Sequence, residues 1–131
     1  MNNKKILIII SVIIIVIVGC AIYMIKNNYK EDIQKQIIIS VYNKENQNIY
    51  KENINTKKEH LIEVLKEIEE LKIVTENSEY GEYINSIMEI EQGDNFYWTY
   101  YINDEYATTG VSNCKIQSEK EYKFKIEEIK Y

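Results

Sequence analysis

Few side chains in this sequence can act as catalytic reagents. The 131 residues include one histidine, His60, and two cysteines, Cys20 and Cys114. Nucleophilic catalysis needs a base beside a serine or cysteine, and a metal site needs clustered ligands, but neither arrangement occurs at a familiar spacing, nor does a phosphate-binding loop. We therefore expect His60 to be an ordinary helix-boundary residue and Cys114 a half-buried apolar one. The sequence predicts that the protein is not an enzyme, requires no cofactor and has no metal site.

Aromatic residues are the more informative group. Eight of the fifteen fall between Tyr80 and Tyr106, and five of the six positions 96–101 are aromatic. Alternate side chains of a strand point to opposite faces. One face would carry Phe96, Trp98, Tyr100 and Ile102, and the other Tyr97, Thr99, Tyr101 and Asn103. We expect the first, more apolar face to lie in the core. Tyrosines on the outer face suit a flat ligand or a partner, although cross-strand aromatic pairs also stabilise a thin sheet without any ligand.

One soluble helix is predicted over residues 57–72. Apolar residues recur there at three- and four-residue spacing, at Leu61, Leu65, Ile68 and Leu71. Charged residues cover the opposite side, and we interpret them as a solvated face rather than a catalytic or metal-binding group. Asn55 or Thr56 would cap the helix, with Glu59 completing a capping box.

Strands are expected on both sides of this helix. Residues 37–42 and 48–54 predict a hairpin before it, and a loop from residue 80 leads to a strand that ends near residue 90. After a turn at 92–95, the remaining expected strands are 96–102, 105–107 and 122–127. Asn103 and Asp104 would form a tight hairpin turn. Two strands, one helix and three to four strands predict an α+β, β-grasp-like fold.

An uninterrupted apolar run, Ile6–Ile25, precedes these elements and is long enough to cross a bilayer as a helix. The chain is divided into a membrane anchor at 1–25, a polar spacer at 26–36 and a domain at 37–131. Lys4 and Lys5 precede the run and Lys26 and Lys30 follow it, so the count of basic residues is nearly tied. A short basic start, an apolar stretch and a long polar remainder are typical of an uncleaved signal anchor. The predicted location is the cell membrane, with the domain outside the cell.

Cys20 leaves a second kind of anchor open. The stretch Ile17–Cys20 resembles a bacterial lipobox, in which the cysteine is lipidated and becomes the mature N-terminus of a lipoprotein. The chain stays apolar from Ala21 to Ile25, which favours a plain membrane helix. Either anchor would tether the domain to the membrane.

The charge of the chain limits its partners. The net charge is −5 at pH 7, and there is no arginine. Nucleic-acid binding is driven by contacts between Lys or Arg and phosphate, so we expect no nucleic-acid partner. The same balance argues against docking on anionic lipid head groups.

The aromatic strand and the residues after it resemble the signature of the transcobalamin C-terminal-like domain. The matching residues are Phe96–Ala107 and Thr109–Val111, which follow the pattern aromatic-Trp-x-aromatic-Tyr-Val-Asn-Gly-Glu, an alanine and a Gly-Val pair. The preceding strand–strand–helix order also fits, so the resemblance covers residues 36–131. Asp104 stands where the family usually has glycine, and residues 117–120 stand where it usually has an acidic-glycine turn.

The resemblance implies an extracellular domain similar to the β-domain of animal cobalamin carriers, which would bind cobalamin or another corrinoid and pass it to a membrane transporter. The ligand-binding residues expected on this basis are Tyr97, Trp98, Tyr101, Asn103, Thr109 and Gly110. A second domain closes over the ligand in those carriers, so a lone domain would bind more weakly unless a partner completes the site. The alternative is a surface protein-interaction or adhesion module, with no small-molecule ligand, that uses the tyrosine face or an open sheet edge.

Overall fold

The computed structural model describes residues 2–31 and 33–131, so Met1 of the predicted anchor and Asp32 of the predicted spacer lie outside the described residues. The chain divides into two compact units, with the boundary between Ile33 and Gln34. The first contains helix α1 (Asn3–Glu31), which continues past the predicted anchor into the predicted spacer. Among the described residues, its stretch Asn3–Asn27 is the one helix long and apolar enough to span a membrane.

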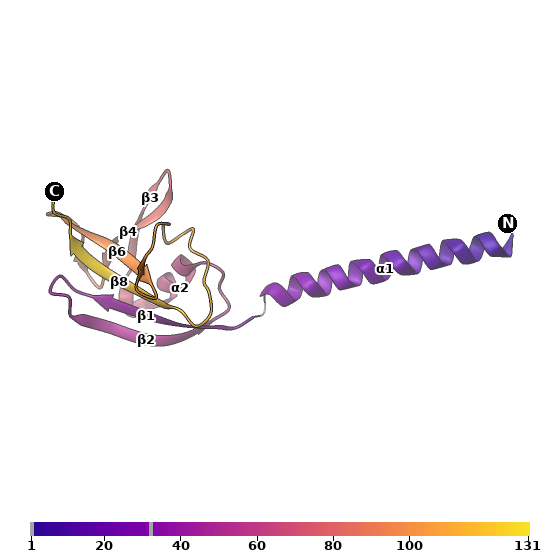
Figure 1. The fold of residues 1–131 in the computed structure, drawn as a ribbon, viewed down its shortest axis with the longest axis horizontal. Coiled ribbons are helices and arrows are strands. Elements are labelled where there is room, and N and C mark those ends of the chain that lie inside the picture. The colour runs from indigo at the N-terminus through magenta and orange to yellow at the C-terminus, as the bar shows by residue number, and fades with distance from the viewer. Residues whose placement is uncertain (1, 32) are drawn as a thin grey trace. The chain divides into compact units, whose positions relative to one another are not determined.

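The second unit is built on a five-stranded sheet with the order β2-β1-β8-β6-β7 (Figure 1). Its strands are β1 (Lys35–Tyr42), β2 (Asn48–Thr56), β6 (Phe96–Ile102), β7 (Glu105–Tyr106) and β8 (Glu121–Glu128). The pair β1 and β8 is parallel, and the other pairs are antiparallel. A parallel pair needs a long crossover, which the chain makes through helix α2 (Leu61–Glu67) and the strands after it. The predicted α+β order of hairpin, helix and further strands is confirmed.

The segment between helix α2 and strand β6 in the sequence forms a second, three-stranded sheet. It comprises β3 (Val74–Ser78), β4 (Gly81–Ile87) and β5 (Ile90–Glu91). Six strands therefore follow α2 in the described chain, more than the three to four predicted. The difference arises mainly from β3, which is polar and mostly exposed and so carries no alternating apolar pattern.

Helix α2 is shorter than the predicted 57–72. It begins after His60, whose backbone N–H donates to the Glu63 carboxylate at 3.0 Å. The predicted capping residues, Asn55, Thr56 and Glu59, all lie before this point. After an extended Ile68, the predicted continuation is only the 3₁₀ turn η1 (Glu69–Leu71).

A distant segment determines where this helix starts. The Leu61 N–H donates to the Cys114 carbonyl at 2.9 Å, and the Ile116 N–H donates to the Glu59 carbonyl at 2.8 Å. His60 and Lys115 also form an antiparallel bridge. Backbone held extended by such pairing cannot adopt helical dihedral angles, so the helix cannot begin earlier.

The core fills the space between the five-stranded sheet and α2. Tyr122 and Phe124 of β8 are fully buried, and the Tyr100 ring stacks on Phe124 with centroids 5.5 Å apart. Burial of one such side chain stabilises the fold by about 1.5–3 kcal/mol. The predicted inner face of β6 is confirmed for Tyr100, Trp98 and Ile102, which all pack in or against the core.

Phe96, predicted on the same inner face, is an exception. It is half-buried at the start of β6 and lies outside the core cluster. The Lys44 ammonium lies 4.7 Å from the centroid of its ring. A cation–π contact with Lys44 therefore accompanies this ring at the start of the strand.

Replacing Gly81 by alanine should destabilise the domain more than replacing Gly93. Both have positive φ, 101° and 142°, so alanine would strain the backbone at either position by about 1–3 kcal/mol. A Cβ at Gly81 would lie 2.4 Å from Ser112 Oγ, whereas no atom lies within 4 Å at Gly93. Ser112 Oγ also accepts the Glu82 N–H at 2.9 Å, so we expect Gly81→Ala to lose about 1 kcal/mol more. Urea unfolding of the full chain in detergent micelles, followed by Trp98 fluorescence, measures the difference; equal losses would contradict this contact.

Candidate ligand-binding site

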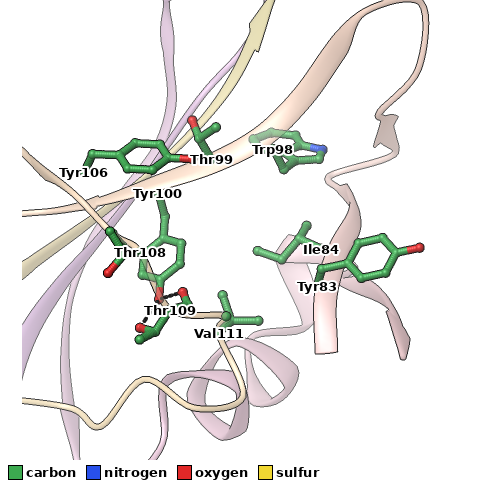
Figure 2. Close-up of a pocket in the computed structure, with 11 residues that line it drawn as sticks. Tyr83, Ile84, Trp98, Thr99, Tyr100, Tyr106, Thr108, Thr109 and Val111 are labelled. Atoms are coloured by element: carbon green, nitrogen blue, oxygen red, sulfur yellow. Dashed lines mark hydrogen bonds between the residues drawn. The ribbon is translucent and has the colours of Figure 1, made fainter. Parts of the chain in front are cut away.

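A pocket of about 230 Å³ opens between β6, β4 and the loop that follows β7 (Figure 2). Its lining residues are Tyr83, Ile84, Trp98, Thr99, Tyr100 and 106–111. Aromatic rings form much of the wall, and the loop adds threonine hydroxyls and main-chain groups. Apolar walls with a few polar groups are typical of small-ligand sites.

The Tyr100 hydroxyl holds the loop side of the pocket in place. Tyr100 extends from β6 to the loop, where its hydroxyl donates to the Thr109 carbonyl at 2.5 Å and lies 3.3 Å from the Thr109 hydroxyl (Figure 2). Burial raises the pKa of Tyr100, so the hydroxyl stays protonated and remains a donor. The length of the Tyr100 side chain therefore sets the distance between the loop and β6.

On the opposite side of the pocket, a hydrogen bond fixes the Trp98 side chain, and a tyrosine lies at the opening. Trp98 Nε1 donates to the Ile90 carbonyl at 2.9 Å, which joins β6 to β5. The Tyr83 hydroxyl donates to the Glu76 carboxylate across the β3–β4 hairpin, and this hydrogen bond raises the pKa of Tyr83. Tyr83 is 39% exposed, so its ring is available at the mouth, whereas Tyr106 lines the pocket with a ring that also packs against Tyr101 on the outer face.

The structure divides the predicted binding residues into two groups. Trp98, Thr109 and Gly110 line the pocket together. Tyr97 and Tyr101 lie on the other face of β6, as the alternation predicts. Asn103 lies in the β6–β7 turn, where its side-chain oxygen accepts the Glu121 N–H at 2.8 Å. A binding role for each of the six stays a prediction.

The outer face of the sheet is largely satisfied by contacts among its own side chains. The Tyr101 hydroxyl donates to the Glu127 carboxylate at 2.9 Å, and its ring meets the Tyr106 ring edge-on with centroids 5.7 Å apart. The Lys125 ammonium lies 5.5 Å from the Tyr101 ring centroid and 5.4 Å from that of Tyr42. This geometry favours the pocket over the outer face as the ligand site. A protein-interaction role for the outer face stays a prediction.

Several pocket residues are not among those predicted from the sequence. Tyr83, Ile84, Tyr106 and Thr108 all line the pocket. The concentration of aromatic residues between Tyr80 and Tyr106 is the signal that could have found the two tyrosines. It was insufficient for Tyr83 because the segment from residue 80 was expected to begin as a loop, and a loop assigns no face to its side chains. It was insufficient for Tyr106 because the short strand expected at 105–107 does not indicate which segments lie beside it.

The residues with reagent chemistry are used elsewhere in the fold. His60 precedes α2, Cys20 is exposed on α1, and Cys114 is buried. Burial raises the pKa of the Cys114 thiol, which disfavours the reactive thiolate. Within residues 2–31 and 33–131, no group of three or more His, Cys, Asp or Glu side chains is placed to hold a metal ion.

Comparison with known proteins gives one family and, among solved structures, several related folds. The family model described as Domain of unknown function (DUF4430) matches residues 58–128. A crystal structure from Ruminococcus gnavus ATCC 29149, of a protein provisionally named as metal binding, gives a TM-score of 0.67 at 21% identity and covers 73% of this chain and 99% of that one. No curated protein matches the sequence.

Haptocorrin in complex with Cbi gives a TM-score of 0.61 at 16% identity, covering 76% of this chain. The match spans 27% of the haptocorrin chain, so the chain corresponds to about a quarter of that protein. Identities this low establish the fold alone. The likeness confirms the resemblance to the transcobalamin type of domain that the residues from Phe96 to Val111 predict.

Replacing Tyr100 by phenylalanine should loosen the pocket loop. The variant keeps the ring that stacks on Phe124 but leaves the Thr109 carbonyl without its donor, which should cost about 1–3 kcal/mol of unfolding free energy. Urea unfolding and amide hydrogen exchange of the full chain in detergent measure the loss and the faster exchange expected near Val111. Tyr97→Phe is the matched control, because no hydrogen bond of its hydroxyl occurs in the described part of the chain. A Tyr100→Phe variant that behaves like this control would show that the bond does not hold the loop.

Proposed function

Since the chain belongs to the family described as Domain of unknown function (DUF4430), we propose that its domain is a membrane-tethered, extracellular module that binds a corrinoid without catalysing a reaction. The observation that carries the proposal is the aromatic pocket around Trp98, in a fold shared with part of haptocorrin, which was solved with Cbi. Corrinoids combine a flat macrocycle with peripheral amide groups, and the pocket combines aromatic rings with hydroxyl and main-chain groups.

The size of the pocket indicates how much of such a ligand it can hold. Its volume of about 230 Å³ is below the roughly 300–1,000 Å³ of ordinary ligand pockets, so it would enclose only part of a corrin. The rest of the ligand would stay exposed and available to a second protein. Weak, one-sided binding suits a carrier that hands its ligand to a membrane transporter, which would complete the site.

The tether supports the same function. Helix α1 is long and apolar enough to span the bilayer, and a short basic start, an apolar stretch and a long polar remainder are typical of a signal anchor with a cytoplasmic N-terminus. The domain would then face the outside, where a scavenged vitamin is first met. Lipidation of Cys20 would give the same surface location by another anchor.

A titration with dicyanocobinamide and cyanocobalamin tests the proposal. Trp98 is the only tryptophan and lines the pocket, so a bound corrinoid should quench its fluorescence. We expect saturable quenching and heat of binding with the full chain in detergent micelles, in the micromolar to millimolar range. Absence of both signals at millimolar ligand would defeat the proposal.

A variant at the mouth locates the binding. Tyr83→Ala should weaken corrinoid binding about two- to tenfold, the worth of one aromatic contact. Tyr97→Ala is the matched control, since Tyr97 is an exposed tyrosine on the opposite face of β6 and should leave the affinity unchanged. Loss of corrinoid binding in Tyr97→Ala, with unchanged binding in Tyr83→Ala, would place the site on the outer face.

A further inference from the structure

The β6 edge beside the pocket carries main-chain groups that need a partner. Successive residues of an antiparallel strand direct their N–H and C=O groups to alternate sides. Odd-numbered positions along β6 face β8, because the Ile129 N–H donates to the Asn95 carbonyl at 2.8 Å and the Asn103 N–H donates to the Glu121 carbonyl at 3.0 Å. Even-numbered positions must then face the other way, toward the pocket.

Contacts at both ends of this edge agree with that assignment. Phe96 and Gly93 exchange two hydrogen bonds of 2.9 Å, and the Tyr100 carbonyl accepts the Ala107 N–H at 3.0 Å. Trp98 lies between these points. No group in the described chain hydrogen bonds with its backbone N–H or C=O, or with the Tyr100 N–H. The Thr99 side chain bonds to Lys125 and Glu127 on the outer face, so only its main chain can line the pocket.

The loop leaves the β6 edge at the point where a longer β7 would have covered it. The register pairs Tyr101 with Tyr106 and brings Ala107 to Tyr100, so continued pairing would place Thr109 opposite Trp98. Instead, the Thr109 carbonyl accepts the Tyr100 hydroxyl. A slot therefore lies along Trp98, with a strand edge on one side and the displaced loop on the other.

We propose that this slot binds an extended peptide segment of a partner protein, which pairs antiparallel with β6 at Trp98 alone, because Gly93 and Ala107 already occupy the positions opposite Phe96 and Tyr100. A residue seated opposite Trp98 would accept its N–H and donate to its C=O, which is the hydrogen-bonding pattern of strand addition. Side chains of the segment would point alternately to either side, where the rings of Tyr83 and Tyr106 can pack against them.

Charge favours a neutral or basic segment. No lysine lines the pocket, and the chain has a net charge of −5. An acidic segment would be repelled, while lysines flanking the paired residues would be attracted. This inference concerns the strand edge and does not rest on corrinoid binding.

Amide hydrogen exchange tests the free edge first. In the full chain in detergent micelles, the Trp98 N–H should exchange at least about tenfold faster than the N–H groups of Tyr97 and Thr99, the neighbouring residues of β6 whose N–H groups face β8. Comparison of Trp98 with Thr99 is the sharpest, because both lie mid-strand. Equal protection of these two amides would overturn the proposal.

A peptide titration tests the occupant. Acetyl-Lys-Val-Thr-Val-Lys-amide should bind and slow the exchange of the Trp98 N–H group, and the same peptide N-methylated at its three central residues should bind at least about tenfold more weakly. Equal binding of the two peptides, or no binding of the first at millimolar concentration, would overturn the proposal. Dicyanocobinamide, titrated in parallel, separates the two proposals. Corrinoid binding without peptide binding would overturn the peptide proposal alone, and peptide binding without corrinoid binding would overturn only the corrinoid proposal.

Discussion

The hydrogen bond from the Tyr100 hydroxyl to the Thr109 carbonyl is the interaction on which the candidate site depends. It joins a strand of the core to the loop after β7 and fixes the width of the pocket between them. The ring of Tyr100 is itself fixed by stacking on Phe124, so the position of the loop is determined by the packed core. Because burial raises the pKa of Tyr100, the bond persists over the whole physiological pH range.

The two faces of β6 have different roles because alternate side chains of a strand point to opposite sides. On the inner face, Tyr100 and Trp98 use their polar atoms to hold β6 against neighbouring segments, which leaves ring surface lining the pocket. On the outer face, the Tyr101 hydroxyl donates to the Glu127 carboxylate, and the Lys125 ammonium lies over the Tyr101 ring. Alternation along one strand thus separates a face that builds the pocket from one that stabilises the sheet.

Sequence reasoning predicted the features that depend on local periodicity. The alternation at Trp98 and Tyr100 and the turn at Asn103 and Asp104, both with positive φ, follow from single segments. Features set by contacts between distant segments were missed: the start of α2 depends on pairing with residues 114–116, and β3 carries no apolar pattern. The pocket was predicted only in part, because the positions of Tyr83 and Tyr106 depend on how two sheets and a loop meet.

We propose that ligand binds in the pocket beside β6 and not on the tyrosine face behind it. Amide chemical-shift changes on the ¹⁵N-labelled full chain in detergent, recorded as dicyanocobinamide is added, distinguish the two faces. We expect the changes to be concentrated at Trp98, Tyr100 and residues 107–111, with little effect at Tyr97 and Lys125. Changes centred on the outer face, or none at saturating ligand, would overturn this assignment.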